Sequence, residues 1–583
     1  MRHGHAAKML ATIDPDAPYG IVIDCGSSGT RLRILEWQLT AARPQLRELS
    51  TLRDEAGLAL RVRPGISSYA RNRSLAVAQI IHLTREAARW IPAHVHGKTP
   101  LYVYATAGLR LLPAAQASGL LDTIATALSH RPACPFAFVE ARILSGEEEA
   151  VFGWLSLNHL LDSDHRGRPT AGWLDLGGAS TQVSHAVADV AAATAEALRD
   201  SEQVSTRLPP LAKGATVAPA IPATPTSHLV FRRSYLRFGK EEAFARSCRL
   251  LVHQALAQPP NQLTPSRTGT AQAAGEGKPD GWDVLQAGVA HPCLLRGDSL
   301  TLDLTSILSH SVLARSLHGP AVFDRRLQPW VHSTRGRVPS IRSLGSSGNG
   351  SVHASPAEPD SAAGDMSVLR FYGTGQAGVC ESLMSQLIVS HDDVCASRDP
   401  APPGPGESSQ RGSTGGAGVG PSDTAPPYRG CDLSRHSLQF EGSFYGAGNY
   451  YYAALQLGLA APDRVYELTP RDYATAAAVT CGREAGLARA HWDALPRWNQ
   501  SGARTSLEWN NARYACFSGM YISSLLRDFF SLPDTGDPIR VSFAVESTPL
   551  DWTMGAFLHA AVAAAARPHG PWTDLSPTGG WAG

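Results

Sequence analysis

The chain has 583 residues, of which 43% are hydrophobic and 18% charged, and its formal net charge is +1. A chain of this length is too long for one hydrophobic core, so we expect at least two lobes. The near-neutral charge argues against a general polyanion binder, and any phosphate site must be local. The 54 glycines and 41 prolines are numerous for a globular protein and predict lobes interrupted by long insertions.

The first 185 residues carry the densest pattern of regular structure. Apolar runs predict strands at residues 19–25, 31–37, 101–105 and 172–175, and a tight turn at residues 26–30 joins the first two. Apolar spacing predicts helices at residues 74–91 and 147–161. Strands that alternate with helices indicate an α/β fold.

Four later segments are rich in Ala, Pro, Gly and Ser: residues 186–226, 259–281, 317–366 and 399–428. This composition predicts long disordered surface insertions, which a folded lobe can carry because loop closure costs little extra entropy as a loop lengthens. Ordered structure is expected to return at residues 229–258, 368–389, 439–459 and 506–566. No segment reaches the roughly 18 to 20 apolar residues that cross a bilayer. Residues 1–18 lack the apolar stretch of a signal peptide, so a membrane anchor missing from this chain stays open.

A glycine turn follows the first predicted strand, in the sequence Asp24-Cys25-Gly26-Ser27-Ser28-Gly29-Thr30-Arg31. Small residues let backbone N–H groups converge on phosphate oxygens, and the hydroxyls add donors. Asp24, at the end of the strand, is suited to a hydrated cation. Taken alone, this segment fits an ordinary hairpin equally well.

The same chemistry returns in Asp175-Leu176-Gly177-Gly178-Ala179-Ser180-Thr181-Gln182. Two such turns would face each other across a cleft. Between them lie Arg110, which can donate to phosphate in bidentate fashion, and three consecutive glutamates at a helix start. Glu147 and Glu148 are expected to stabilise the helix dipole. Glu149 is expected to turn toward the boundary between the lobes.

These segments, in this order, resemble the signature segments of the apyrase, or nucleoside triphosphate diphosphohydrolase, family. Residues 19–31, followed by Arg63-Pro64-Gly65-Ile66-Ser67, look most like its Golgi and lysosomal nucleoside diphosphatase branch. Similarity continues at residues 371–375, 444–452 and 551–556. The resemblance implies an α/β fold of two RNase H-like lobes of the actin/hexokinase ATPase superfamily, with a cleft between them. Lobe I would comprise residues 19–145 and 543–566, and lobe II residues 146–542 with the insertions.

The resemblance also implies residue roles. Glu149 would be the general base for a water that attacks the terminal phosphorus, with Ser180 and Gln182 positioning this water and Thr106 nearby. Asp24 and Asp175 would hold Ca²⁺ or Mg²⁺ through water, and the base would stack between Tyr452 and Trp552. The phosphates would be bound by Gly26, Ser27, Ser28, Gly29, Thr30, Arg31, Arg110, Gly177, Gly178, Ala179 and Ser180.

Nine cysteines leave at least one thiol unpaired, and none has zinc-ligand CxxC spacing. The resemblance implies bridges Cys293–Cys380, Cys395–Cys431 and Cys481–Cys516, with Cys25, Cys134 and Cys248 unpaired. Such bridges persist only in an oxidising compartment. Sequons at Asn72, Asn349 and Asn499 would permit glycosylation there.

The implied activity is hydrolysis of the terminal phosphate of nucleoside tri- and diphosphates, with UDP- and GDP-type diphosphates favoured. The implied place is the lumen of the Golgi or another secretory compartment, membrane-anchored or extracellular, and no nucleic-acid partner is expected. Two alternatives stay open. Residues 145–150 resemble the exopolyphosphatase and guanosine-pentaphosphate phosphohydrolase family on the same fold, and a catalytically inactive nucleotide-binding protein would keep the same lobes. Nucleotide preference, oligomeric state and the role of the insertions also stay open.

Overall fold

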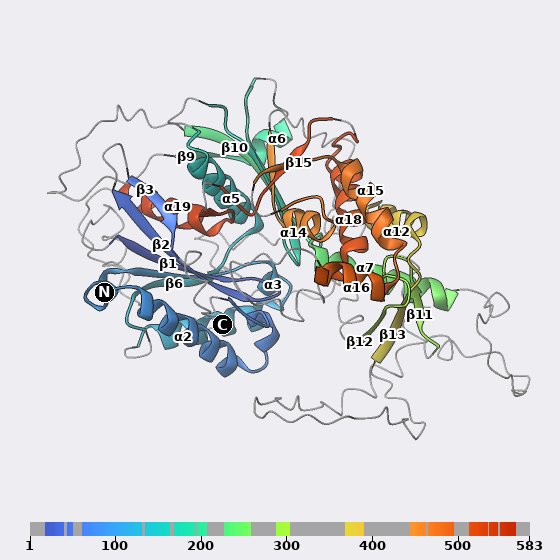
Figure 1. Cartoon of the computed structure of the whole chain (residues 1–583). Helices are drawn as coiled ribbons and strands as arrows, with labels where there is room; N and C mark the ends of the chain where they lie inside the picture. Colours follow the sequence, from blue (N-terminus) through green and yellow to red (C-terminus); the bar gives the residue numbers. More distant parts are fainter. Residues whose placement is uncertain are drawn as a thin grey trace, which may run out of the picture.

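The computed structural model describes residues 18–39, 44–49, 61–130, 134–163, 168–191, 193, 195–206, 227–257, 287–303, 368–389, 443–461, 464–494, 512–534, 536–545 and 548–566. These residues form two large mixed sheets, a small sheet, a two-stranded ribbon and helices that pack around them (Figure 1).

The first large sheet has the strand order β3–β2–β1–β5–β6, and β4 pairs with β2. Strand β2 pairs antiparallel with both β1 and β3, whereas β5 and β6 run parallel to β1. Helices α2 and α4 bury their apolar faces against it, in a core that includes Ile23, Ile80 and Leu120. Its elements are β1 (Tyr19–Cys25), β2 (Thr30–Leu39), β3 (Pro44–Glu48), β4 (Arg61–Val62), α2 (Arg73–Trp90), β5 (Pro100–Ala105), α3 (Ala107–Arg110), α4 (Ala114–Leu128) and β6 (Ala137–Ile143).

The second large sheet has the order β15–β16–β14–β7–β8–β10–β9. Here β7, β8 and β10 are antiparallel, and β14 and β16 run parallel to β7. Its strands are β7 (Gly172–Leu176), β8 (Ser180–Ala186), β9 (Ser201–Ser205), β10 (Ser227–Leu236), β14 (Phe444–Gly448), β15 (Tyr466–Leu468) and β16 (Ile539–Val541).

The same connection pattern therefore occurs twice. In each sheet three strands pair antiparallel, β1–β2–β3 and β7–β8–β10, and two later strands, β5–β6 and β14–β16, continue parallel from the first. The second sheet has in addition β9 beside β10 and β15 beside β16. This repetition confirms the α/β fold with two RNase H-like halves. The strands expected at residues 19–25, 31–37, 101–105 and 172–175, and the helices expected at residues 74–91 and 147–161, are all present with small shifts at their ends.

Two helices fill the space between the large sheets: α5 (Gly146–Leu160) and α19 (Thr553–Ala566). They belong to one apolar cluster that contains side chains of both sheets, among them Val22 and Trp173. Figure 1 shows α19, in red, beside the teal α5 despite their distance in sequence. The helices approach so closely that a Cβ added to Gly555 would lie 1.8 Å from the carbonyl oxygen of Phe152. The backbone N–H of Gly555 donates to Ser156 Oγ at 2.7 Å.

The remaining helices cover the outer side of the second sheet, beside a small sheet of strands β11, β13 and β12 (Figure 1). The elements of this region are α7 (Lys240–Ala257), β11 (Val289–His291), β12 (Ser299–Asp303), β13 (Val368–Gly373), α12 (Ala377–Val389), α14 (Asn449–Gln456), α15 (Pro470–Cys481), α16 (Ala485–Ala494) and α18 (Ala515–Ser524). The ribbon of β17 (Ala544–Val545) and β18 (Thr548–Pro549) precedes α19.

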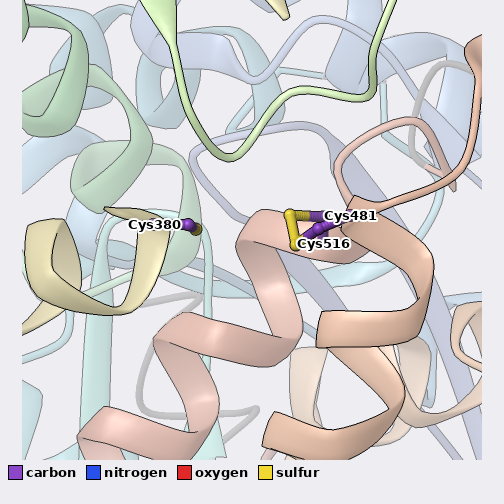
Figure 2. Close-up of side chains that lie close together, drawn as sticks. All are labelled: Cys380, Cys481 and Cys516. Carbon is purple, nitrogen blue, oxygen red and sulfur yellow. A yellow bond between two sulfur atoms is a disulfide. The ribbon is translucent and has the colours of Figure 1, made fainter. Parts of the chain in front are cut away.

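Two of the three expected disulfides are present, Cys293–Cys380 and Cys481–Cys516. Cys25, Cys134 and Cys248 are buried and form no disulfide, as expected. Figure 2 shows Cys380 beside the Cys481–Cys516 bridge, and these three sulfur atoms lie within 4.8 Å of one another. Because all three are bonded in disulfides, they do not offer thiolates to a metal ion. Cys395 and Cys431 lie outside the described residues, as do the sequons at Asn349 and Asn499.

The predicted extent of one disordered insertion was wrong. Residues 186–226 were predicted to be disordered, but they contain α6 (Ala195–Arg199) and β9, which pairs antiparallel with β10. The pairing with a neighbouring strand stabilises β9 in spite of the Ala-rich composition around it. The insertions at residues 259–281, 317–366 and 399–428 lie outside the described residues. No helix among the described residues is long and apolar enough to span a membrane.

Candidate active site

The first glycine turn, residues 26–30, connects β1 to β2, and we call it the first clasp. Asp24 and Arg31 lie opposite each other at its base, and Arg31 Nη1 is 2.8 Å from Asp24 Oδ2. Residues 63–67 pack on the clasp from outside. A Cβ on Gly65 would lie 2.4 Å from the carbonyl oxygen of Gly26, so only glycine fits there without a shift of the backbone.

The second clasp, residues 177–180, connects β7 to β8 in the same way. Asp175 lies opposite Gln182, in the position that corresponds to Asp24 opposite Arg31. The backbone N–H of Gly177 donates to the carbonyl oxygen of Ser180 at 2.9 Å, which closes the turn. Asn449 Nδ2 donates to the carbonyl oxygen of Leu176 at 2.8 Å and supports the turn from behind.

The two clasps meet at the boundary between the sheets. A Cβ added to Gly178 would lie 2.5 Å from Ser27 Oγ. A Cβ added to Gly108 would lie 2.8 Å from Ser27 Cα, so the short helix α3 reaches the same point. The glycines at these positions allow three segments of backbone to converge on one small volume, where their N–H groups can act together on an anion.

Glu149 stands beside this meeting point, in the first turn of α5. Its helix begins with a capping box in which Ser145 Oγ accepts from the N–H of Glu148 and the Glu148 carboxylate accepts from the N–H of Ser145. Glu148 also pairs with Arg142, so it has a structural role. Glu149 takes no part in these contacts, and the residue is only 7% exposed.

Polar side chains from three other elements converge on the Glu149 carboxylate. Arg110 Nη2 lies 3.1 Å from Glu149 Oε2 and 3.2 Å from Ser180 Oγ. Gln182 Nε2 lies 3.1 Å from Glu149 Oε2 and 2.7 Å from Ser180 Oγ. The structure therefore brings together Glu149, Ser180 and Gln182, which the sequence analysis named as general base and water-positioning residues, and Arg110, which it named for phosphate binding.

Burial raises the pKa of Glu149 to about 8, although the Arg110 guanidinium acts in the opposite direction. Burial likewise raises the pKa of Asp175 to about 7, with Arg31 opposing the change and Asp551 and Asp24 adding to it. The pKa of Asp24 is also raised, first by burial. Four carboxylates, those of Asp24, Glu149, Asp175 and Asp551, thus influence one another in a poorly hydrated region, which is a frequent property of catalytic sites.

The carboxylates at the clasps fit a divalent cation. Asp24 Oδ1 is buried and makes no hydrogen bond within the described part of the chain. A buried carboxylate oxygen without a partner is costly, and a hydrated cation satisfies it. Asp175 lies at the equivalent place on the other clasp, and oxygen ligands of this kind suit Ca²⁺ and Mg²⁺.

The other predicted residues lie in different surroundings. Thr106 follows β5, is buried, and donates its backbone N–H to the carbonyl oxygen of Cys25 at 3.3 Å. Tyr452 is 41% exposed and lies close enough to Arg31 and Arg61 to affect their pKa values. Trp552 is only 5% exposed, and its ring centroid lies 6.4 Å from that of Tyr104 within the apolar cluster between the sheets.

Sequence reasoning missed several residues at this place. Ser234 Oγ lies 3.1 Å from Gln182 Nε2, and Asp551 Oδ2 lies 2.6 Å from Arg33 Nη2 beside the clasp carboxylates. Asn449 lies in the segment 444–452 that resembles the family, but the sequence analysis gave it no role. No local motif marks these residues, because strands and loops far apart in sequence bring them to the site.

Comparison with known proteins identifies the family of this chain. The model of the GDA1/CD39 (nucleoside phosphatase) family matches residues 11–308, a little over half of the chain, and that range includes both clasps and Glu149. The chain belongs to the GDA1/CD39 family.

Curated relatives of this GDA1/CD39 protein include human ectonucleoside triphosphate diphosphohydrolase 4, which is 32% identical over 202 residues, 30% of this chain and 33% of the relative. The mouse protein of the same name is 27% identical over 362 residues, 57% of this chain and 55% of the relative. Chicken ectonucleoside triphosphate diphosphohydrolase 2 is 39% identical over 189 residues, 30% of this chain and 36% of the relative. The matches thus span from a third to about half the length of these relatives.

Solved structures similar to this GDA1/CD39 protein include nucleoside triphosphate hydrolases from Neospora caninum. That match has a TM-score of 0.47 at 16% identity and covers 93% of this chain and 92% of the other. A Ppx/GppA family member from Aquifex aeolicus matches with a TM-score of 0.35 at 10% identity and covers 94% and 98% of the two chains.

Proposed function

We propose that this protein hydrolyses the terminal phosphoanhydride bond of nucleoside di- and triphosphates, with a divalent cation and with Glu149 as general base. The observation that carries the proposal is the position of Glu149 beside the meeting point of the two clasps. There its carboxylate contacts Arg110 and Gln182, and both of these contact Ser180.

The protein's own groups suit the activation of water. A general base works best when its pKa is near the working pH, and the raised pKa of Glu149, about 8, meets that condition. Gln182 Oε1 is buried and has no hydrogen-bond partner among the described residues. A water between Glu149 and Gln182 would donate one proton to each, which aims a lone pair at phosphorus while Glu149 accepts the proton that leaves.

The clasps suit the phosphate. Phosphoryl transfer needs positioning and neutralisation of charge more than covalent chemistry. Ser27 and Ser28 offer hydroxyl and backbone donors on one side, and Gly178, Ala179 and Ser180 offer donors on the other. Fixed donors of this kind stabilise the charge that the transferred group carries in the transition state.

Asp24 and Asp175 are the residues that would hold the cation, through water. When bound, Ca²⁺ or Mg²⁺ supplies positive charge that neutralises phosphate oxygens and the departing phosphate. The protein contributes the arrangement of these two carboxylates at equivalent positions of the clasps. The Arg31 guanidinium neutralises part of their charge.

The proposal includes two lobes with the substrate between them. Lobe I comprises residues 19–145 and 543–566, and lobe II comprises residues 146–542. UDP- and GDP-type diphosphates are the favoured substrates, with the base beside Tyr452. The two disulfides, which need an oxidising environment, support action in the Golgi or another secretory compartment.

The test is phosphate release from a panel of UDP, GDP, ADP, UTP, ATP and inorganic polyphosphate, with Ca²⁺, Mg²⁺ or EDTA. We expect nucleotides to be hydrolysed with either cation and EDTA to abolish release. Polyphosphate as the preferred substrate would instead favour an exopolyphosphatase. Release that persists unchanged in Glu149→Gln would favour an inactive nucleotide-binding protein with a contaminating phosphatase.

A further inference from the structure

Three cations lie around the clasps, and none of them forms an ion pair within the part of the chain that the structure describes. Arg61 and Arg63 lie on the first clasp, where a Cβ added to Gly29 would be 3.3 Å from Arg61 Nε and 3.3 Å from Arg63 Cγ. Strand β4 holds them there, since Arg61 pairs with Arg31 across the β2–β4 ladder. Arg61 Nη2 also lies 3.4 Å from Ser28 Oγ, so its guanidinium extends over the clasp.

The third cation, Lys240, comes from the other side. It begins α7, and its backbone N–H donates to the carbonyl oxygen of Gly177 at 3.0 Å. The next N–H, that of Glu241, donates to the carbonyl oxygen of Gly178 at 2.9 Å, so the first turn of α7 is tied to the second clasp. Gly178 meets both Ser27 and the Glu241 carboxylate, and the Lys240 ammonium lies close enough to Arg61 and Arg63 for their charges to act on it.

The three charges act on one another. Loss of solvent and the charges of Arg31 and Arg63 lower the pKa of Arg61 to about 10. Burial, together with Arg63 and Arg61, lowers the pKa of Lys240, while Glu241 acts in the opposite direction. Within the described residues none of the three forms an ion pair, whereas Arg31 pairs with Asp24 and Arg110 with Glu149. The like charges of these three side chains repel one another, the Glu241 carboxylate offsets this repulsion only in part, and an anion bound between them relieves it.

We infer that Arg61, Arg63 and Lys240 form a binding site for the phosphates that remain on the nucleotide, those next to the one that Glu149 and the clasps act on. The inference rests on the proposed function for the identity of the ligand, a nucleoside di- or triphosphate. The binding itself does not require hydrolysis, because a chain of linked phosphates bridges cations of both halves of the molecule. Orthophosphate, a single group, would fill the clasps without reaching all three cations.

The number of phosphates in the ligand should therefore affect how tightly it binds to the cluster. A diphosphate places one phosphate beyond the attacked group and a triphosphate places two, so the longer chain contacts more of the cluster. Charge-assisted hydrogen bonds to phosphate are strong, and loss of one costs about tenfold in affinity. Removal of the three charges should therefore weaken triphosphates more than diphosphates and leave orthophosphate nearly unaffected.

The experiment compares Arg61→Gln, Arg63→Gln, Lys240→Gln and the triple variant with the wild type and with Arg85→Gln. Arg85 is an exposed arginine in the second half of α2 and serves as the matched control. With excess Mg²⁺, we expect KM for a nucleoside triphosphate to rise about tenfold for each charge removed, with kcat changed much less. KM for the diphosphate should rise less, and Arg85→Gln should behave as wild type.

A second measurement needs no catalysis. Calorimetric titration with imidodiphosphate, which resists hydrolysis, and with orthophosphate reports binding directly. We expect the triple variant to lose most of its affinity for imidodiphosphate and to keep its affinity for orthophosphate. Unchanged imidodiphosphate binding, or an equal loss for both anions, would overturn the inference. If the wild type hydrolyses no nucleotide, the proposed function fails, and this titration still decides whether the cation cluster binds linked phosphates.

Discussion

Arg110 Nη2 lies 3.1 Å from Glu149 Oε2, so the guanidinium is bound to the carboxylate that we propose as general base. Arg110 Nη1 also donates to the carbonyl oxygen of Leu144 at 2.9 Å, which fixes the guanidinium in place. The sequence analysis assigned Arg110 to phosphate binding. Its contacts support an additional role, because a fixed positive charge keeps part of the buried Glu149 population ionised and ready to accept a proton.

Glu149→Gln should abolish most of the activity without unfolding the protein. Glutamine keeps the size of the side chain and can still pair with its neighbours, but it cannot accept a proton from water. General-base removal typically costs about 10² to 10⁴ in rate. The measurement is kcat for a nucleoside diphosphate, with thermal unfolding to verify the fold.

The neighbouring position supplies the control for that variant. Glu148 caps α5 and pairs with Arg142, so Glu148→Gln should lower stability by about 1 kcal/mol and keep most of the activity. Equal loss of kcat in the two variants would contradict a catalytic role that belongs to Glu149 alone.

Arg110→Gln should move the acidic limb of the pH profile to higher pH. Burial raises the pKa of Glu149 to about 8, and Arg110 limits this rise. Since the base works in its deprotonated form, kcat/KM should increase with pH through its pKa, and loss of Arg110 raises that pKa further. The measurement is kcat/KM against pH at saturating Mg²⁺ for both proteins, so that protonation of the substrate affects them equally. A limb that moves to lower pH would exclude this electrostatic role.

Much of the site could be predicted because its central parts are local. Each clasp consists of the end of a strand, an aspartate and a glycine turn, so residues 24–31 and 175–182 were sufficient to predict both turns. The capping box that starts α5 is also contained in a few residues, and it explains why Glu148 and Glu149 face different surroundings.

Other features depend on contacts between distant segments. Nothing in the sequence near Trp552 indicates that α19 packs between the two sheets and buries this ring. The convergence of Arg61 with Lys240 requires that the two clasps meet, which local patterns do not encode. The strand β9 was missed because the Ala-rich segment before it has the composition of an insertion, whereas pairing with β10 decides its conformation.

Tyr452→Ala and Trp552→Ala should have different effects. Tyr452 is 41% exposed, so its loss should cost little stability and raise KM for nucleotides several-fold through lost stacking with the base. Trp552 is buried against Tyr104, so Trp552→Ala should lower the free energy of unfolding by about 3 to 5 kcal/mol. Thermal unfolding measures the loss of stability. KM for UDP, compared with KM for inorganic pyrophosphate, measures the loss of base stacking. A KM for pyrophosphate that rises as much as that for UDP in Tyr452→Ala would argue against base stacking.

Cys516→Ser should cause the neighbouring disulfide to rearrange. The variant leaves the Cys481 thiol within 4.8 Å of Cys380 Sγ. Its thiolate can attack that sulfur, which forms Cys380–Cys481 and releases Cys293 as a thiolate. Non-reducing peptide mapping at mildly alkaline pH should therefore find Cys293 free in part of the molecules.

The double variant Cys481→Ser/Cys516→Ser provides the contrast, because it lacks the attacking thiol. It should keep Cys293–Cys380 intact and lose about 2 to 4 kcal/mol of stability with its missing bridge. An intact Cys293–Cys380 bridge beside an unreacted Cys481 in the single variant would mean that the packed helices α12, α15 and α18 hold the sulfurs out of line for exchange. The single variant would then be as homogeneous as the double one.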